Sequence, residues 1–232
     1  MISLLERAVC AESRDALARQ LAETVAGDLD TAIEENNSAT LVVSGGSTPR
    51  PLFAALSSKS IDWSRVIVTL ADERWVAPDQ ADSNERMVRE QLLVNYAGSA
   101  RFVSLYRPAA ADASTLADIE TSLAQLANPF TVVLLGMGED GHTASLFPDA
   151  PEIEAAMSLD EQGNVMFMQP PSVGQTRITF TRRRLLATRH LYLHITGKNK
   201  WHLLESALSG GKLPIAGVAT EAGDNIQLYW AA

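Results

Sequence analysis

The sequence is poor in cysteine, in long apolar runs and in positive charge, and each shortage excludes a class of structure or partner. Cys10 is the only cysteine among 232 residues, so the chain forms no internal disulfide and offers no cysteine cluster to a metal. No stretch reaches the roughly 18 consecutive apolar residues of a membrane-spanning helix, and we expect no contact with a membrane. Glu6 and Arg7 interrupt the N-terminus where a signal peptide would be apolar, which predicts a cytoplasmic protein.

Positive charge is scarce overall, because the formal net charge is -9 at pH 7. Nucleic-acid backbones are bound by basic surfaces, so we expect no nucleic-acid partner. An anionic small molecule would need cations gathered locally, against the overall charge. The hydrophobic fraction of 46% and charged fraction of 20% are ordinary for a globular protein with a sizeable core.

Apolar β runs and amphipathic helical segments alternate along the chain, without repeats, low-complexity tracts or linkers. This order predicts one domain over residues 1–232, an α/β fold with a doubly wound, mainly parallel sheet flanked by helices, similar to a Rossmann fold. The clearest expected strands are 39–43, 66–70, 102–105, 132–135, 164–169, 190–196 and 225–230, and the clearest expected helices are 13–34, 82–96, 113–126 and 201–208.

Residues 131–148 hold the most informative loop. An apolar run, Val132 to Leu135, leads into a loop with three glycines that also carries Glu139, Asp140 and His142. A histidine in such a loop is held by the scaffold and open to a ligand. We expect residues 143–146 to begin a helix. Ser145 lacks the pattern of a nucleophile elbow, so we do not expect a serine nucleophile.

A second loop, residues 44–50, follows the expected strand 39–43. Its Gly45 and Gly46 let the backbone approach a ligand, and Ser47 and Thr48 add hydroxyls before the next helix. Free N–H groups at the start of a helix favour an anion, helped by the helix dipole. The loop is equally compatible with a plain strand-to-helix turn.

Two further strand ends carry charge. Asp72, Glu73 and Arg74 follow the expected strand 66–70, although a solvated turn with a surface ion pair would have the same composition. Lys198 and Lys200 follow the expected strand 190–196. Because the carboxyl ends of parallel strands lie along one edge, these loops could meet in a site for a small phosphorylated substrate and acid–base chemistry.

Three smaller predictions concern the surroundings of these loops. Asp82 is placed to cap a helix, with Glu85 closing a capping box. Arg182 to Arg184 cannot share one helix face, so we expect most of them to be solvated. His190 and His194 have the same parity on a strand, but a third ligand is missing and we expect no metal.

At this point the chain resembles the 6-phosphogluconolactonase family. Its segment GMGEDGHTASLFP, residues 136–148, is similar to the most specific signature of that family. Other blocks follow in the family's order, namely SGGSTP at 44–49, DERWV at 72–76 with DSN at 82–84, RIT at 177–179 and TGKNK at 196–200. Thr176 stands where the family often has proline before the arginine, which leaves the path of that loop open.

The resemblance implies a fold of the NagB/RpiA type and hydrolysis of 6-phospho-D-glucono-1,5-lactone in the oxidative pentose phosphate pathway. It implies His142 as general acid and base, with Asp140 or Asp72 orienting or stabilising the imidazole. It also implies a phosphate site at Gly45, Gly46, Ser47 and Thr48, with Arg74, Arg177 and Lys200 as charged contacts. Backbone N–H groups of the glycine loops are the first candidates for oxyanion donors. No cofactor and no metal are implied.

Two other functions remain open from the sequence. Glucosamine-6-phosphate deaminases and isomerases share the fold and a similar Asp-Gly-His loop, but follow it with a catalytic glutamate where this chain has Phe147. A sugar-phosphate-binding protein without catalysis is the second alternative, and the presence of both Asp72 and His142 argues against it. The protein is expected to be a monomer or a homodimer, and the sequence does not decide between them.

Overall fold

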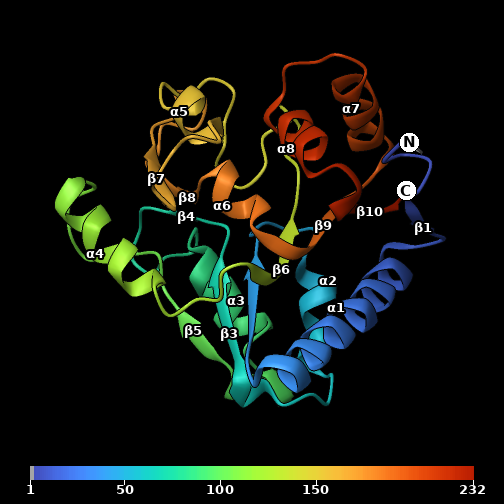
Figure 1. Ribbon diagram of the computed structural model, residues 1–232. Coiled ribbons are helices and arrows are strands. Elements are labelled where there is room, and N and C mark those ends of the chain that lie inside the picture. Colours follow the sequence, from blue (N-terminus) through green and yellow to red (C-terminus); the bar gives the residue numbers. More distant parts are fainter. Residues whose placement is uncertain (1–2) are drawn as a thin grey trace.

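The structure, a computed structural model, describes residues 3–232 and is built around a seven-stranded sheet (Figure 1). All six strand pairs of this sheet are parallel, so the predicted mainly parallel α/β architecture is confirmed. In spatial order the strands are β1 (Val9–Ala11), β10 (Ile226–Ala231), β9 (Thr188–Thr196), β6 (Phe130–Leu135), β2 (Ala39–Val43), β3 (Val66–Leu70) and β5 (Arg101–Val103).

The central strands β6 and β2 are buried at every residue, which explains their continuous apolar sequences. The helices that flank the sheet are α1 (Arg14–Asn36), α2 (Arg50–Ser57), α3 (Asn84–Gln91), α4 (Ala113–Leu123), α5 (Ile153–Met157), α6 (Arg182–Leu186), α7 (Lys198–Leu208) and α8 (Pro214–Ala222). The longest, α1, begins after Ser13, whose hydroxyl accepts from the N–H of Ala16, and ends at Asn37 in the left-handed conformation.

A second, antiparallel sheet of three strands was not predicted. Its strands are β4 (Asp72–Arg74), β8 (Arg177–Phe180) and β7 (Val165–Met168), in that order (Figure 1). Ala71 joins the two sheets, because its N–H donates to Val43 of β2 and its carbonyl accepts from Phe180 of β8. The charged segment 72–74, expected as a loop or solvated turn, is therefore a strand, and its register places Arg74 opposite Arg177.

The structure corrects three local predictions. Residues 143–146 form a tight turn instead of a helix start, because Ala144 adopts a left-handed φ of 50° and the N–H of Leu146 donates to Thr143. The N-cap of α3 is Ser83, not Asp82, since the Ser83 hydroxyl accepts from the N–H of Arg86. The arginines of α6, expected to be mostly solvated, are half-buried at Arg182 and Arg183 and buried at Arg184. Arg184 is buried with its guanidinium 3.5 Å from the ring centroid of Phe130.

None of the helices within residues 3–232 is both long enough and apolar enough to cross a membrane.

Candidate active site

A pocket of about 240 Å³ opens at the carboxyl ends of the parallel strands. Its walls come from the loop after β2, from β4, from the loop after β6, from β9 and from the first turn of α7. Eight of the ten residues predicted for the site line it, which are Gly45, Gly46, Ser47, Thr48, Asp72, Arg74, His142 and Lys200. Asp140 and Arg177 do not line it, but Asp140 contacts the lining residue His142 and Arg177 pairs with the lining residue Arg74 across β8 and β4.

His142 is held on three sides. Its Nδ1 lies 2.5 Å from Oδ1 of Asp140, which also accepts from the backbone N–H of His142 at 3.1 Å. The ring of Phe147 stacks on the imidazole, with centroids 4.1 Å apart and planes inclined by 29°. On another side a Cβ on Gly138 would lie only 2.2 Å from Cε1 of His142, so only glycine leaves room for the ring. These contacts leave Nε2 as the nitrogen that can meet a ligand.

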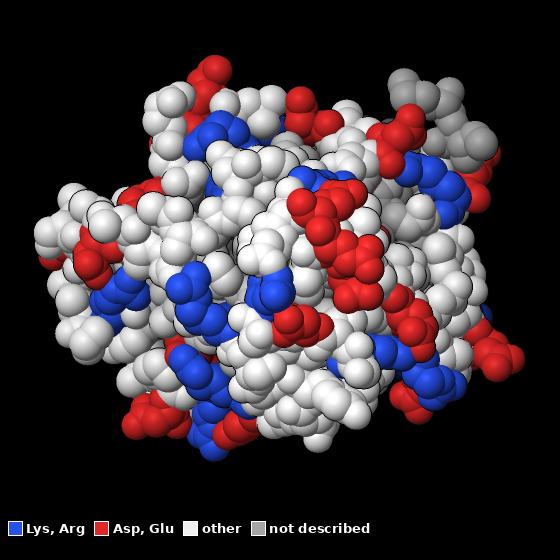
Figure 2. All heavy atoms as spheres, turned by 60° about the horizontal axis from the view of Figure 1, so that its bottom comes forward, with Lys and Arg blue, Asp and Glu red and all other residues white. Residues whose placement is uncertain are grey.

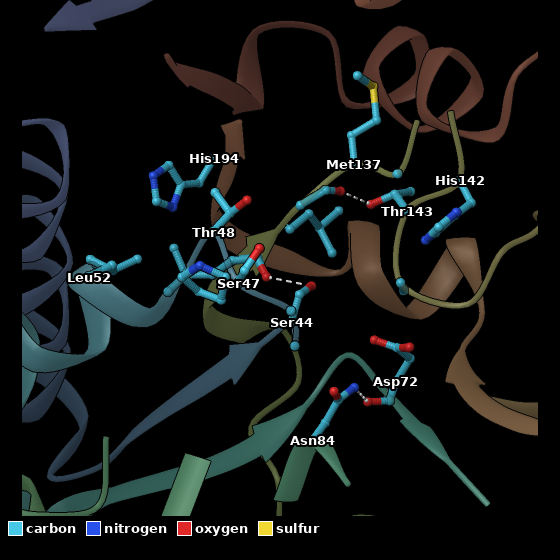
Figure 3. Close-up of a pocket in the computed structure, with 18 of the residues that line it drawn as sticks. Ser44, Ser47, Thr48, Leu52, Asp72, Asn84, Met137, His142, Thr143 and His194 are labelled. Carbon is cyan, nitrogen blue, oxygen red and sulfur yellow. Dashed lines mark hydrogen bonds between the residues drawn. The ribbon is translucent and has the colours of Figure 1, made fainter. Parts of the chain in front are cut away.

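The sequence left Asp140 and Asp72 as alternative partners of His142, and in the structure Asp140 makes that contact. Asp72 is 7% exposed and lies across the pocket from His142 (Figure 3). Its Oδ2 accepts from the buried hydroxyl of Ser145 at 2.6 Å, and its backbone carbonyl accepts from the side chain of Asn84 at 2.9 Å. The turn at 143–146 thus turns Ser145 toward Asp72, and Ser145 acts as a support for the carboxylate.

Glu73 has a structural place rather than one in the pocket. Its carboxylate is fully buried and accepts from the N–H groups of Arg74, Asn84 and Glu85, each at 2.7 Å, and from the hydroxyl of Ser83 at 3.0 Å. Burial raises the pKa of Glu73, and the four donors act in the opposite direction. Since β4 alternates sides, Glu73 fixes the start of α3 while Asp72 faces the pocket.

The loop after β2 presents unpaired backbone donors. Within residues 3–232, the N–H groups of residues 45–48 have no hydrogen-bond acceptor, and Gly46 has a φ of 98° that favours glycine. The loop ends at α2, which begins at Arg50. In the histidine loop, by contrast, the N–H groups of Gly138 and Gly141 already bond to carbonyls of the same loop. Free backbone donors for an anion therefore gather at residues 45–48.

Three cations surround the pocket without a carboxylate partner. Lys200, Arg74 and Arg177 make no ion pair within 4.0 Å in the described part of the chain. Burial lowers the pKa of Lys200, while the charge of Glu139 raises it. Burial and the charge of Arg74 lower the pKa of Arg177, whose Nε is buried without a partner among residues 3–232.

This local positive charge contrasts with the outer surface. The face drawn in Figure 2 carries acidic side chains as well as lysine and arginine, and the formal net charge of the whole chain is -9. Unpaired cations next to unpaired N–H groups are an arrangement that binds phosphate or carboxylate.

Three residues that line the pocket or support a lining residue were not among the predicted site residues. They are Asn84, Ser145 and His194. Asn84 packs against Gly45, where a Cβ would lie 1.9 Å from its Oδ1. Asn84 and Ser145 lie in the family-like blocks at 82–84 and 136–148, but no site role was predicted for Asn84, and Ser145 was considered only as a nucleophile. His194 was recognised only as a member of an alternating strand, although that parity also turned it to the pocket side. Between residues 3 and 232 no group of three or more His, Cys, Asp or Glu side chains is placed to hold a metal ion.

Comparison with known proteins gives a consistent set of relatives. A family model described as glucosamine-6-phosphate isomerases/6-phosphogluconolactonase matches residues 12–230. A 6-phosphogluconolactonase of Rhizobium meliloti is 41% identical over 223 residues, covering 95% of this chain and 96% of the relative. One of Pseudomonas aeruginosa is 46% identical over 194 residues, covering 83% and 81%. A solved 6-phosphogluconolactonase structure from Shewanella baltica superposes with a TM-score of 0.92 at 40% identity, covering 96% of both chains.

Proposed function

The chain belongs to the glucosamine-6-phosphate isomerase/6-phosphogluconolactonase family, and we propose that His142 is the general acid and base of its lactone hydrolysis. Its identity to these relatives over most of the chain supports a 6-phosphogluconolactonase activity, which is that of a carboxylic ester hydrolase. The proposed reaction converts 6-phospho-D-glucono-1,5-lactone and water into 6-phospho-D-gluconate. The observation that carries the proposed mechanism is the contact between His142 and Asp140 beside an open pocket.

The first step is attack by water. A carboxylate only accepts hydrogen bonds, so Asp140 favours the tautomer in which Nδ1 of His142 carries the proton. Nε2 then has a free lone pair that takes a proton from a water molecule as its oxygen bonds to the lactone carbonyl carbon. The carbonyl oxygen becomes an oxyanion, and the imidazolium is stabilised by Asp140 and by the face of Phe147.

The second step opens the ring. The tetrahedral intermediate collapses, the bond between the carbonyl carbon and the ring oxygen breaks, and Nε2 of His142 returns its proton to that oxygen. One histidine serves both steps because an imidazole can accept a proton in the first step and return it in the second. We assign Asp72 a different part, in which the oxygen that is not bonded to Ser145 accepts a hydrogen bond from a substrate hydroxyl.

The phosphate group of the substrate would bind at the end of the pocket formed by residues 45–48 and Lys200. The free N–H groups and the ammonium of Lys200 are the donors there. Arg74 lines the pocket and would contact the substrate directly, whereas Arg177, paired opposite Arg74 on β8 and outside the pocket lining, would add positive charge from behind it. Because both arginines lack carboxylate partners within residues 3–232, a substrate anion would meet their charge without displacing an internal ion pair.

The proposal is tested by incubating purified protein with freshly generated 6-phosphogluconolactone and subtracting spontaneous hydrolysis. We expect turnover of the lactone and no release of ammonia from glucosamine 6-phosphate. Ammonia release would support the deaminase instead. Tight binding of 6-phosphogluconate without turnover would support a binding protein without catalysis.

A further inference from the structure

His194, in β9, is a buried histidine that the proposed mechanism does not use. It lines the same pocket as His142 but on the other side, and Figure 3 shows it next to Thr48 and away from His142 and Asp72. Its side chain is 5% exposed, and its Nδ1 is fully buried without a hydrogen-bond partner in residues 3–232. A buried polar group without a partner usually has a structural or functional reason.

The surroundings of His194 keep its ring neutral. Burial, with a further contribution from the positive charge of Lys200, lowers its pKa from 6.5 to about 4. The charge of Glu139 raises the pKa of Lys200, whereas the charge of Arg14 lowers it. A second cation here would repel Lys200, whereas a neutral imidazole adds a donor without adding charge.

A neutral imidazole carries one ring proton, either on Nδ1 or on Nε2. A buried N–H group without an acceptor is rarer and more costly than a buried lone pair without a donor. Nδ1 is fully buried without a partner, so we infer that it carries the lone pair and no proton. The proton is therefore on Nε2. Nε2 also has no hydrogen-bond partner among the described residues, but unlike Nδ1 it is not fully buried, and His194 is one of the residues that line the pocket.

We propose that His194 is a neutral hydrogen-bond donor to the phosphate group of the substrate, acting through Nε2 beside Lys200 and Thr48. The inference rests on the proposed function for the identity of the substrate, a sugar phosphate. Lys200 supplies charge and residues 45–48 supply backbone N–H groups, whereas His194 supplies a donor of fixed direction. Figure 3 shows His194 and His142 at opposite sides of the pocket, and the phosphate and the lactone carbonyl lie at opposite ends of the substrate.

The proposal is tested with two variants of His194. His194→Leu removes the donor, whereas His194→Gln keeps a side-chain N–H donor at a similar reach. We expect the leucine variant to raise KM for the lactone, and the inhibition constant of 6-phosphogluconate, about tenfold, with kcat within twofold of wild type. The glutamine variant should restore most of the lost affinity. Inhibition by gluconate, which lacks the phosphate, should be the same in all three proteins.

Three results would overturn the proposal. They are unchanged KM and inhibition constants in a folded leucine variant, a fall in kcat alone, and equal weakening of gluconate. A measurement on the wild-type protein does not depend on the folding of a variant. We expect titration with inorganic phosphate to shift the NMR signal of the His194 Nε2–H, and no shift at saturating phosphate would refute the contact. If the wild type failed to hydrolyse the lactone but showed that shift, the proposed function would be wrong and the phosphate contact would stand.

Discussion

Replacing Gly138 with alanine tests whether the position of His142 matters for catalysis. The added Cβ would lie 2.2 Å from Cε1 and 2.3 Å from Nδ1 of His142, and 2.7 Å from Oδ1 of Asp140. Ordinary van der Waals contact begins at about 3.4 Å, so the imidazole must retreat by about 1 Å. A misplacement of about 1 Å in a reacting group costs on the order of 100-fold in rate, which is the expected loss in kcat.

The assay is steady-state hydrolysis of 6-phosphogluconolactone, with the fold checked by circular dichroism and thermal unfolding. KM should stay within about threefold, because the residue 45–48 loop and Lys200 are not displaced. Gly27→Ala is a matched control, since a Cβ at that position in α1 meets nothing within 4 Å. Gly27→Ala should leave kcat unchanged and stabilise the helix by up to about 1 kcal/mol. A folded Gly138→Ala enzyme with wild-type kcat would refute the reasoning.

Four further predictions follow from individual contacts. Asp140→Asn should lower kcat about tenfold. This loss is smaller than for a buried carboxylate because the Asp140 side chain is 42% exposed, and an unchanged kcat would show that the contact between Asp140 and His142 does not contribute to catalysis. Lys200→Ala should raise KM about tenfold or more at unchanged kcat, and an unchanged KM would remove Lys200 from the phosphate site. Glu73→Gln should lower the free energy of unfolding by about 2 kcal/mol while the folded enzyme keeps kcat within a few-fold, because an amide nitrogen cannot accept from the start of α3. The unfolded state protonates His194 before the folded state does, so wild type should lose about 2–3 kcal/mol more stability than His194→Leu as pH falls from 6.5 to about 4, and equal losses in urea titrations would argue against a neutral buried ring.

The parallel sheet and the meeting of its loops were predictable from the sequence, and the reason is local. The strand cores, such as 39–43 and 66–70, are short continuous apolar runs, and each is followed by glycine or by charge. Once the strands are parallel, the carboxyl ends must share an edge, so His142, Asp72 and Lys200 come together without knowledge of tertiary contacts.

The details that failed depend on contacts between distant segments. Residues 143–146 have a helical composition, but Ser145 bonds Asp72 and the N–H of Ser145 donates to Thr179 of β8. Those long-range bonds outweigh the local preference. The small sheet was missed for the same reason, since β4 has only three residues and is a strand only because β8 pairs with it. The spacing of residues along the sequence does not predict such a pairing.

The contact between His142 and Asp140 was within reach of the sequence, because two residues in one tight loop can bond across it. The sequence could not separate Asp140 from Asp72, since both lie near the strand edge and both are carboxylates. The structure distinguishes them through their partners, which are His142 for one and Ser145 for the other. Arg177 was expected as a phosphate contact but does not line the pocket, and its Cζ lies 6.0 Å from the ring centroid of Phe147.

The measurement that tests the account most directly is kcat of His142→Gln for 6-phosphogluconolactone, corrected for spontaneous hydrolysis. Glutamine preserves approximate size and polarity but cannot take and return a proton near neutral pH. We predict that kcat falls by about 100- to 10,000-fold with the fold intact and with 6-phosphogluconate still bound. A His142→Gln enzyme that folds, binds the product and keeps kcat near the wild-type value would contradict His142 as the general acid and base.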